Sequence, residues 1–392
     1  MGRTVPRTWT YDPALYAPAR YRKACSYQAF IPDPIGDMPL DLPGEVAGVV
    51  SDAEGAIHSL NAIGGHALAP LARLLLRTES IASSKVEGMQ VDARALARAE
   101  ANTDTGERTN PTALEVLANI DAMQLAVENA ASVESATLES ILDIHRALMA
   151  GSPTPEIGGQ VRAEQNWIGG NDYNPCGADF VPPPPEEVDQ LLDDLCGFSS
   201  AETLPPLVQA AIAHAQFETI HPFKDGNGRT GRALVQVLLR RRSLAPRYVP
   251  PISVVLASDK GRYISGLTAF RDGNVAGWVQ DFAVAAARAA HLAERYLGKA
   301  ERLTEQWKDQ LRAGPNPRSD AAAWALIEVL VGHPVITVAV AVAATGRAKP
   351  AVGQAMDQLA EAGVLIPLKA SKRNRAWEAV GLLDLVIETD RS

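Results

Sequence analysis

The sequence predicts a mainly α-helical protein, and three observations support that fold class. Apolar residues recur at helical spacing over most of the 392 residues, whereas runs that could form strands are short and few. Glycine and proline mark the ends of the periodic segments. Hydrophobic residues make up 46% and charged residues 21%, as in an ordinary globular protein with a large core.

Net charge and cysteine content argue against several classes of protein. A net charge of −9 argues against a broad nucleic-acid surface. Cys25, Cys176 and Cys196 are odd in number and lack CxxC spacing, so they indicate neither a disulfide framework nor a zinc site, and a cytoplasmic protein is expected. We find no signal-peptide h-region and no segment near the roughly 18 apolar residues of a membrane span, so no membrane partner is expected.

The N-terminal part predicts an arm followed by two helices. Residues 1–42 are rich in Pro, Arg and Tyr without a clean period, which favours an extended arm wrapped on the body. An amphipathic pattern predicts a helix over about 42–63, which Gly64 and Gly65 close. A second helix is expected over about 67–85.

The next third of the chain predicts further helices and one break. Helical patterns recur over about 91–103, 111–130 and 136–149, and proline starts another helix that ends near Phe198. Between residues 151 and 181 the pattern stops, and glycines punctuate short runs. A β-hairpin is the simplest prediction for this segment.

A glycine-rich loop between two helices is the densest part of the sequence. The helices are predicted over 207–220 and 229–240. Asp225-Gly226-Asn227-Gly228 favours tight turns with positive φ and is incompatible with a helix interior. Backbone N–H groups of a glycine turn that opens a helix bind anions, so phosphate is the ligand expected here.

The side chains around this loop indicate group transfer. Arg229 and Arg232 are three residues apart, so both can reach phosphate oxygens from one face of the helix. Asp225 can hold Mg²⁺ together with phosphate and water, and His221 can take a proton from a hydroxyl group. The combination predicts transfer of a nucleotidyl or phosphoryl group from a magnesium-bound nucleotide to an alcohol.

Each of these features alone is more often structural. A DGNG run is usually a turn, arginines that open a helix are usually solvated, and a histidine before proline usually packs. Their order within twelve positions favours the functional interpretation. His145 and His214 lie at helical spacing and are expected to be packed histidines, while nothing in the spacing decides whether Tyr263 approaches the nucleotide.

The C-terminal part predicts three helices, a linker and a small domain. The helices are expected over 252–270, 274–290 and 291–313, and residues 313–317 form the linker. Beyond it, the pattern resembles a winged helix-turn-helix with helices over 320–331, 337–344 and 350–362, strands over 363–366 and 377–380, and a basic tip at Lys369, Lys372, Arg373 and Arg375. DNA contact is one interpretation. Asp357 and Glu361 on the third helix make dimerisation or target recruitment fit equally well.

The stretch from His221 to Arg232 resembles the HxFx[DE]GNGRxxR signature of the Fic family at every fixed position. The resemblance implies a helical Fic fold and transfer of AMP from Mg·ATP to a hydroxyl side chain of a target protein. It implies the following roles: His221 as base, Phe223 as core anchor, Asp225 as Mg²⁺ ligand, Gly226, Asn227 and Gly228 as the anion hole, Arg229 and Arg232 as ligands of the outer phosphates, and Gly231 as part of the phosphate-binding segment.

Two further segments resemble the same family. Ser83, Glu87 and Gly88 fill the fixed positions of the [ST]xxxE[GN] inhibitory motif, which implies that Glu87 pairs with Arg232 and blocks productive ATP binding. The alternative is a purely structural role, in which Gly88 is a C-terminal helix cap and Glu87 is a solvated carboxylate. The segment that contains Trp167, Ile168, Gly169 and Gly170 resembles the hairpin flap that pairs with the target backbone.

The sequence therefore predicts an autoinhibited protein adenylyltransferase. We expect a Tyr, Ser or Thr acceptor, self-modification and a homodimer, and domains over residues 1–105, 106–312 and 318–392. One alternative is removal of AMP by the same site, with Glu87 orienting water. A second is a DNA-binding regulator whose Fic module acts as a ligand sensor. The complete catalytic signature argues against this second alternative.

Overall fold

A computed structural model of the chain describes residues 2–14, 16–63, 68–105, 109–130, 136–368 and 375–385, and the predicted mainly α fold is confirmed. The helical body consists, in chain order, of α1 (Gly44–Ala62), α2 (Leu68–Val86), α3 (Ala93–Thr105), α4 (Pro111–Ala130), α5 (Leu138–Met149), α6 (Pro185–Ser200), α7 (Pro206–Ile220), α8 (Asn227–Arg241), α9 (Ile252–Ser258), α10 (Lys260–Arg271) and α11 (Val275–Ala313). Within the described ranges, no helix combines the length and apolar character that a membrane span needs.

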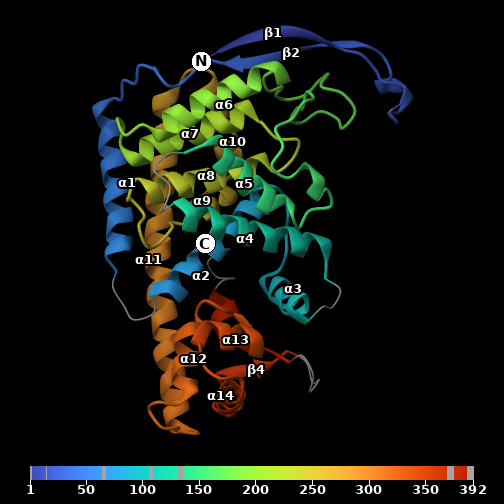
Figure 1. The fold of residues 1–392 in the computed structure, drawn as a ribbon. Coiled ribbons are helices and arrows are strands. Elements are labelled where there is room, and N and C mark those ends of the chain that lie inside the picture. Colours follow the sequence, from blue (N-terminus) through green and yellow to red (C-terminus); the bar gives the residue numbers. More distant parts are fainter. Residues whose placement is uncertain are drawn as a thin grey trace.

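The long helix α11 connects the body with the C-terminal domain (Figure 1). One hydrophobic core extends along it and includes residues from Ile35 to Leu382. The sequence suggested two helices here, over 274–290 and 291–313, but the structure has one. No glycine or proline interrupts residues 278–297, so nothing ends the first helix.

The single helix expected over 252–270 is instead divided into α9 and α10 at Asp259. The Asp259 carboxylate accepts a hydrogen bond from the N–H of Arg262 at 3.0 Å, which caps α10. Asp259 has φ −139°, outside the helical region. The capping side chain therefore explains the break that the apolar period did not reveal.

Helices α7 and α8 form the buried centre of the body. Every side chain of α7 from Leu207 to Ile220 is buried. The two helices approach closely at Gly231, where an added Cβ would lie 2.8 Å from Glu218 Oε1 and 2.9 Å from the Phe217 ring. This pair of buried helices fixes both ends of the loop that joins them.

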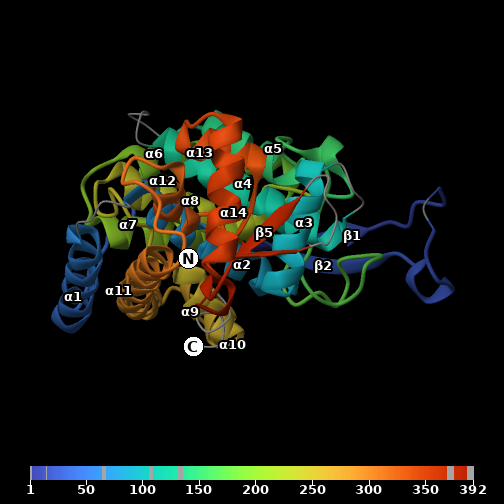
Figure 2. The same ribbon diagram turned by 90° about the horizontal axis from the view of Figure 1, so that it is seen from below.

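The N-terminal arm is extended, as expected, but it forms a β-ribbon that projects from the helical body (Figures 1 and 2), so the expectation that it wraps on the body is wrong. Strands β1 (Gly2–Trp9) and β2 (Cys25–Pro32) pair antiparallel, from Gly2 opposite Pro32 to Trp9 opposite Cys25. The ribbon projects beyond the helical body (Figures 1 and 2). Because β1 is largely exposed on both faces, its sequence lacks the apolar alternation that would reveal a strand.

A disulfide joins Cys25 to Cys176, which corrects the expectation that the cysteines form none. The two residues are 151 positions apart, and their Cα atoms lie 6.3 Å apart. Only the fold brings them together, because no spacing pattern links them. Cys196 is a free thiol. The cysteine argument for a cytoplasmic location is thereby lost, and the location stays a prediction.

The segment between residues 151 and 184 contains one β-bridge, between Ile168 and Phe180, rather than the strands of the expected hairpin. Gly169 and Gly170 follow the bridge with φ of 76° and 75°. Asn171 then accepts hydrogen bonds from the N–H groups of the two residues that follow Asp172. These turns end the pairing after a single residue, and the segment, called the flap below, is a bridged loop.

The C-terminal domain contains the expected helices and strands, and one further strand, in the order α12 (Ala322–Leu330), β3 (Val335–Thr337), α13 (Val338–Thr345), α14 (Lys349–Glu361), β4 (Leu365–Pro367) and β5 (Ala376–Ala379). The sheet has the antiparallel order β3-β5-β4. Of the expected basic tip, Lys369, Lys372 and Arg373 lie outside the described residues. The winged-helix assignment and the domain boundaries stay predictions.

We predict that Trp278→Ala destabilises the helical body strongly. Trp278 is 2% exposed, donates a hydrogen bond to the Ala211 carbonyl at 2.7 Å and packs on Gly266. The change should lower the free energy of unfolding by about 3–5 kcal/mol, which chemical denaturation would measure. The half-buried Trp324 provides a matched control, and equal losses in both variants would contradict this packing role.

Candidate functional site

The loop between α7 and α8 begins at His221, which has an unusual backbone conformation. Its φ of 50° is left-handed, which few residues other than glycine adopt. The His221 carbonyl accepts hydrogen bonds from Arg162 Nε at 2.9 Å and Asn166 Nδ2 at 3.2 Å. These two flap residues therefore stabilise the strained turn that directs His221 into the site.

Phe223 and Asn227 close the loop from the inside. Phe223 is fully buried, as the anchor role requires. The Asn227 side chain accepts a hydrogen bond from the Phe223 N–H and donates one to the Phe223 carbonyl, both at 2.8 Å. Since these bonds occupy the buried Asn227 amide, the backbone of this residue, and not its side chain, remains to bind an anion.

The first turn of α8 is formed by Gly226, with φ 77°, and by Gly228. An added Cβ on Gly228 would lie 2.0 Å from Glu87 Oε1. The Glu87 carboxylate therefore lies directly against the helix N-terminus, where backbone N–H groups and the helix dipole favour an anion. It occupies part of the space that the sequence assigned to phosphate.

Glu87 also pairs with Arg232, as its sequence position suggested. Arg232 Nη2 lies 2.7 Å from Glu87 Oε1 and 2.7 Å from the Ser83 carbonyl, and Arg232 Nε donates to Ser83 Oγ at 2.9 Å. Gly88, with φ 83°, follows the end of α2. The glycine cap of this helix and the pairing of Glu87 with Arg232 therefore occur in the same structure. Burial opposes ionisation of Glu87, but Arg232 outweighs it and holds the pKa of Glu87 below its usual value.

Asp225 and Arg229 lie on the other side of the loop. The Asp225 side chain is 61% exposed, and Oδ1 accepts a hydrogen bond from the Gly226 N–H at 2.6 Å. Arg229 is buried, with Nη2 3.7 Å from Asp225 Oδ2. Among the described residues, Arg229 Nε and Nη1 have no hydrogen-bond partner. A buried guanidinium with free donors is well suited to an anionic ligand.

His221 is held in its neutral form. Burial, which outweighs the opposing effect of the Glu218 carbonyl, lowers the pKa of His221 to about 4. At neutral pH the imidazole is therefore unprotonated at one nitrogen, and this is the form that can accept a proton.

His145 of α5, to which the sequence assigned no functional role, packs against the loop between α7 and α8 and supports it. Its ring stacks on Phe223 with a centroid distance of 3.7 Å. Nδ1 accepts the Gly159 N–H at 3.0 Å, so the proton lies on Nε2, which donates to the Asp225 carbonyl at 3.0 Å. The expectation of a packed histidine is confirmed, and the contacts show that it positions the loop.

Glu79 is a second residue that the sequence analysis missed. Its buried carboxylate accepts hydrogen bonds from the N–H and hydroxyl of Ser253 at 2.8 and 2.6 Å, and from Gln236 at 3.2 Å. It thereby fastens α2 to α8 and α9. A signal was available, because Glu79 stands at the position in the apolar stripe of α2 that follows Leu71 and Leu75.

Behind the site, a buried group of polar side chains fills the space between α7 and α10. His214 Nε2 lies 2.9 Å from the Tyr263 hydroxyl, so Tyr263 faces the core. Burial lowers the pKa of His214 to about 3 and raises that of Glu218 to about 7. Gly231 contacts this group, so its lack of a side chain lets α8 pack closely on α7, and the phosphate-binding role that the signature implied stays a prediction.

The four predicted docking residues of the flap lie together but are already engaged. Trp167 packs edge-on against Trp9 at 5.5 Å. The Ile168 side chain is 39% exposed, but its backbone is paired. Its N–H donates a hydrogen bond to the Phe180 carbonyl, and its carbonyl accepts one from the Phe180 N–H. Side chains at Gly169 and Gly170 would clash with neighbouring atoms. Ile168 therefore has no free backbone groups for strand addition by a target.

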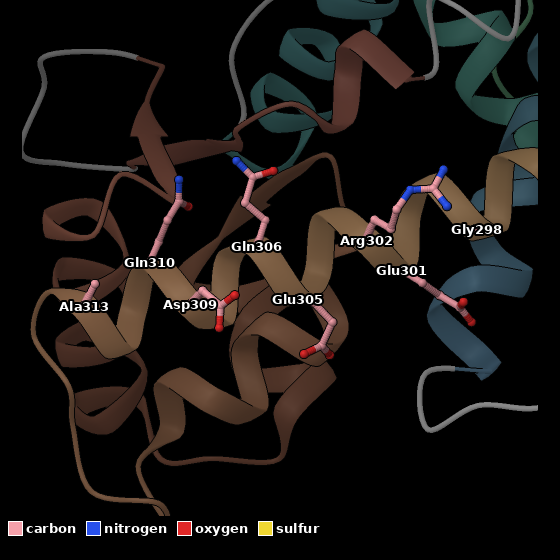
Figure 3. Close-up of a pocket in the computed structure, with 8 residues that line it drawn as sticks. All are labelled: Gly298, Glu301, Arg302, Glu305, Gln306, Asp309, Gln310 and Ala313. Atoms are coloured by element: carbon pink, nitrogen blue, oxygen red, sulfur yellow. The ribbon is translucent and has the colours of Figure 1, made fainter.

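A shallow hollow of about 730 Å³ lies along α11, far along the chain from the signature (Figure 3). Its eight lining residues all belong to the segment from Gly298 to Ala313 of this one helix. It contains none of the signature residues, so it is separate from the proposed nucleotide site.

Comparison with known sequences agrees with the signature. Residues 135–239 match the Fic/DOC family, and residues 48–128 match the Fic/DOC family N-terminal region. The protein adenylyltransferase Fic of Drosophila erecta is 29% identical over 200 residues, which cover 49% of this chain and 37% of that protein. That of Culex quinquefasciatus is 32% identical over 147 residues, covering 37% and 26%. The matched region thus spans between about a quarter and little more than a third of the length of these relatives.

Solved structures support the fold. A Fic family protein from Desulfovibrio desulfuricans G20 superposes with a TM-score of 0.52 at 22% identity, covering 88% of this chain and 98% of that one. Fic-1 from C. elegans gives a TM-score of 0.52 at 21% identity, covering 66% and 73%. With the complete signature between α7 and α8, the chain contains a Fic/DOC domain over residues 135–239, preceded by a match to the Fic/DOC family N-terminal region over residues 48–128.

Proposed function

We propose that the protein is a protein adenylyltransferase that transfers AMP from ATP to a Tyr, Ser or Thr hydroxyl of a target protein. The observation that carries this proposal is the arrangement of neutral His221 beside an α8 N-terminus that is flanked by the buried Arg229 and Arg232. The proposal is supported by the relatives in Drosophila erecta and Culex quinquefasciatus, both of which are named protein adenylyltransferase Fic. The protein itself is proposed as one acceptor.

His221 serves as the base in this reaction. It takes the proton of the target hydroxyl, whose oxygen forms a bond to the α-phosphorus of ATP while the bond to the leaving pyrophosphate breaks. The N–H groups of Gly226, Asn227 and Gly228 and the guanidinium of Arg229 stabilise the charge that develops on the phosphate oxygens. His145 and Asn166 keep the loop in place.

Asp225 is the residue that would hold Mg²⁺. Its carboxylate is exposed at the mouth of the loop, which suits an ion that takes its other ligands from phosphate and water. When bound, Mg²⁺ supplies positive charge to the phosphates. His145 fixes the Asp225 backbone from below and so orients the carboxylate.

We propose that Glu87 inhibits the enzyme mainly by its position. The Glu87 side chain is 36% exposed, so solvent screens its attraction to the buried Arg232, and screened ion pairs contribute only ~0–1 kcal/mol, less than a tenfold effect. However, the carboxylate lies against Gly228, where it competes with phosphate for space, and it also occupies Arg232. A misplacement of the reacting groups by about 1 Å can cost ~100-fold in rate, so steric exclusion is the stronger brake.

Glu87→Gly should raise AMP transfer by more than about tenfold, because it frees both the helix N-terminus and Arg232. The measurement is the transfer of α-labelled ATP with Mg²⁺ to the protein itself and to cell lysate. His221→Ala added to this variant should abolish the label. Glu87→Gln is the matched control, since it removes the charge but keeps the volume, and it should remain inhibited.

If Glu87→Gly leaves the rate unchanged, the proposed brake is wrong. Equal activation by Glu87→Gln and Glu87→Gly would show that charge, not volume, inhibits. If no variant transfers label while the same proteins remove AMP from a modified target, the removal reaction replaces the proposed function.

The low pKa of His221 predicts a nearly flat pH profile. With a pKa of about 4, the neutral base is almost fully present from pH ~5.5 to ~8, and activity falls only below that range. An ordinary histidine would instead lose about 90% of its neutral form at pH ~5.5. Transfer rates of the Glu87→Gly protein across this range would distinguish the two, and a tenfold fall would contradict the assignment.

Asp225→Asn should raise the Mg²⁺ concentration needed for half-maximal transfer by about tenfold or more, because a charged ligand is lost. Titration of Mg²⁺ at fixed ATP with the Glu87→Gly background measures this. Asp189→Asn, on the exposed surface of α6, is a matched control that should leave the titration unchanged. An unchanged titration for Asp225→Asn would remove it from the metal site.

A further inference from the structure

A groove of about 740 Å³ lies between the N-terminal ribbon and the flap. We call it the ribbon groove. Trp9, Tyr11 and Asp12 line it from the ribbon, and Glu164, Trp167 and Asp172 line it from the flap.

The two walls of the ribbon groove are held at a fixed separation. The Cys25–Cys176 disulfide links them covalently. Tyr21 stacks on Tyr173 with ring centroids 5.1 Å apart, and Trp9 packs edge-on against Trp167. A groove with rigid walls needs little ordering to accept a ligand.

One end of the ribbon groove opens at the catalytic loop. Lys224, inside the signature, lines it. So do Arg162 and Asn166, whose side chains hold the His221 carbonyl. A polypeptide in the groove would therefore reach the base within the length of a few residues.

The exposed charges of the ribbon groove are mainly negative. Asp12, Glu164 and Asp172 are exposed, against one exposed cation, Lys224. The other lining cation, Arg162, is buried and donates to backbone carbonyls, among them those of His221 and Pro183. The groove thus offers aromatic faces and a carboxylate excess, which together favour lysine and arginine side chains.

We propose that the ribbon groove binds an extended, basic segment of the target protein and leads its hydroxyl side chain to His221. This rests on the proposed function, because it assigns the groove to the acceptor of that reaction. The ribbon is thereby a second docking wall, which compensates for the internally paired backbone of Ile168 on the flap.

The test measures binding without nucleotide, so it does not depend on AMP transfer. The probes are two fluorescein-labelled peptides in which one tyrosine and one threonine are flanked either by lysines or by glutamates. Fluorescence anisotropy with the full, oxidised chain should show the lysine-flanked peptide binding about tenfold more tightly, as a few partly exposed charge pairs would give.

The triple variant Asp12→Asn/Glu164→Gln/Asp172→Asn should abolish this preference, whereas Asp52→Asn, an exposed acid on α1, should keep it. Cys25→Ser/Cys176→Ser should weaken binding of the lysine-flanked peptide severalfold because the ribbon is released. Equal binding of both peptides by the unchanged protein, or a preference that survives the triple variant, would overturn the proposal. Peptide preference without AMP transfer in any assay would overturn the proposed function while leaving the groove as a basic-peptide site.

Discussion

The buried guanidinium of Arg232 is the charge on which the arrangement of the site depends. It is 2% exposed at the junction of α2, α7 and α8, and a buried charge without acceptors is strongly unfavourable. Ser83 and Glu87 supply those acceptors from α2. The contact proposed to inhibit is thus also the contact that satisfies Arg232, and an anion that displaces Glu87 has to supply equivalent acceptors.

This constraint links the stability of α2 to the state of the site. Glu79 fastens the middle of α2 to α8 and α9, and Asn119 donates to the Ser80 carbonyl and to Ser84. The middle of α2 is thus held on several sides, whereas Glu87 lies just beyond its last helical residue, Val86, and next to Gly88, which has φ 83°.

Burial also sets the chemistry of the catalytic loop. The same enclosure that keeps His221 neutral holds its carbonyl on Arg162 and Asn166, so the flap determines the geometry of the base. The flap is in turn joined to the N-terminal ribbon by a disulfide and by stacked aromatic rings. The ribbon, which projects beyond the helical body (Figures 1 and 2), is therefore connected to His221 by a short series of contacts.

Local sequence by itself determined the helices, because apolar spacing reports the buried face of each helix, and it determined the loop at Gly226, because that turn requires positive φ. The residue types of the signature located the site. Tertiary structure alone decided the partners of those residues: Asn227 binds the loop itself, Gly231 packs on α7, and His145 and Glu79 support the site from other helices.

Tertiary structure also decided the ribbon and the disulfide. The exposed strand β1 has no apolar side to mark it, and a bond between residues 151 positions apart leaves no local periodicity. A periodic pattern records how a segment faces the core. It does not record which distant segment lies on the other side, since that depends on the packing of the whole chain.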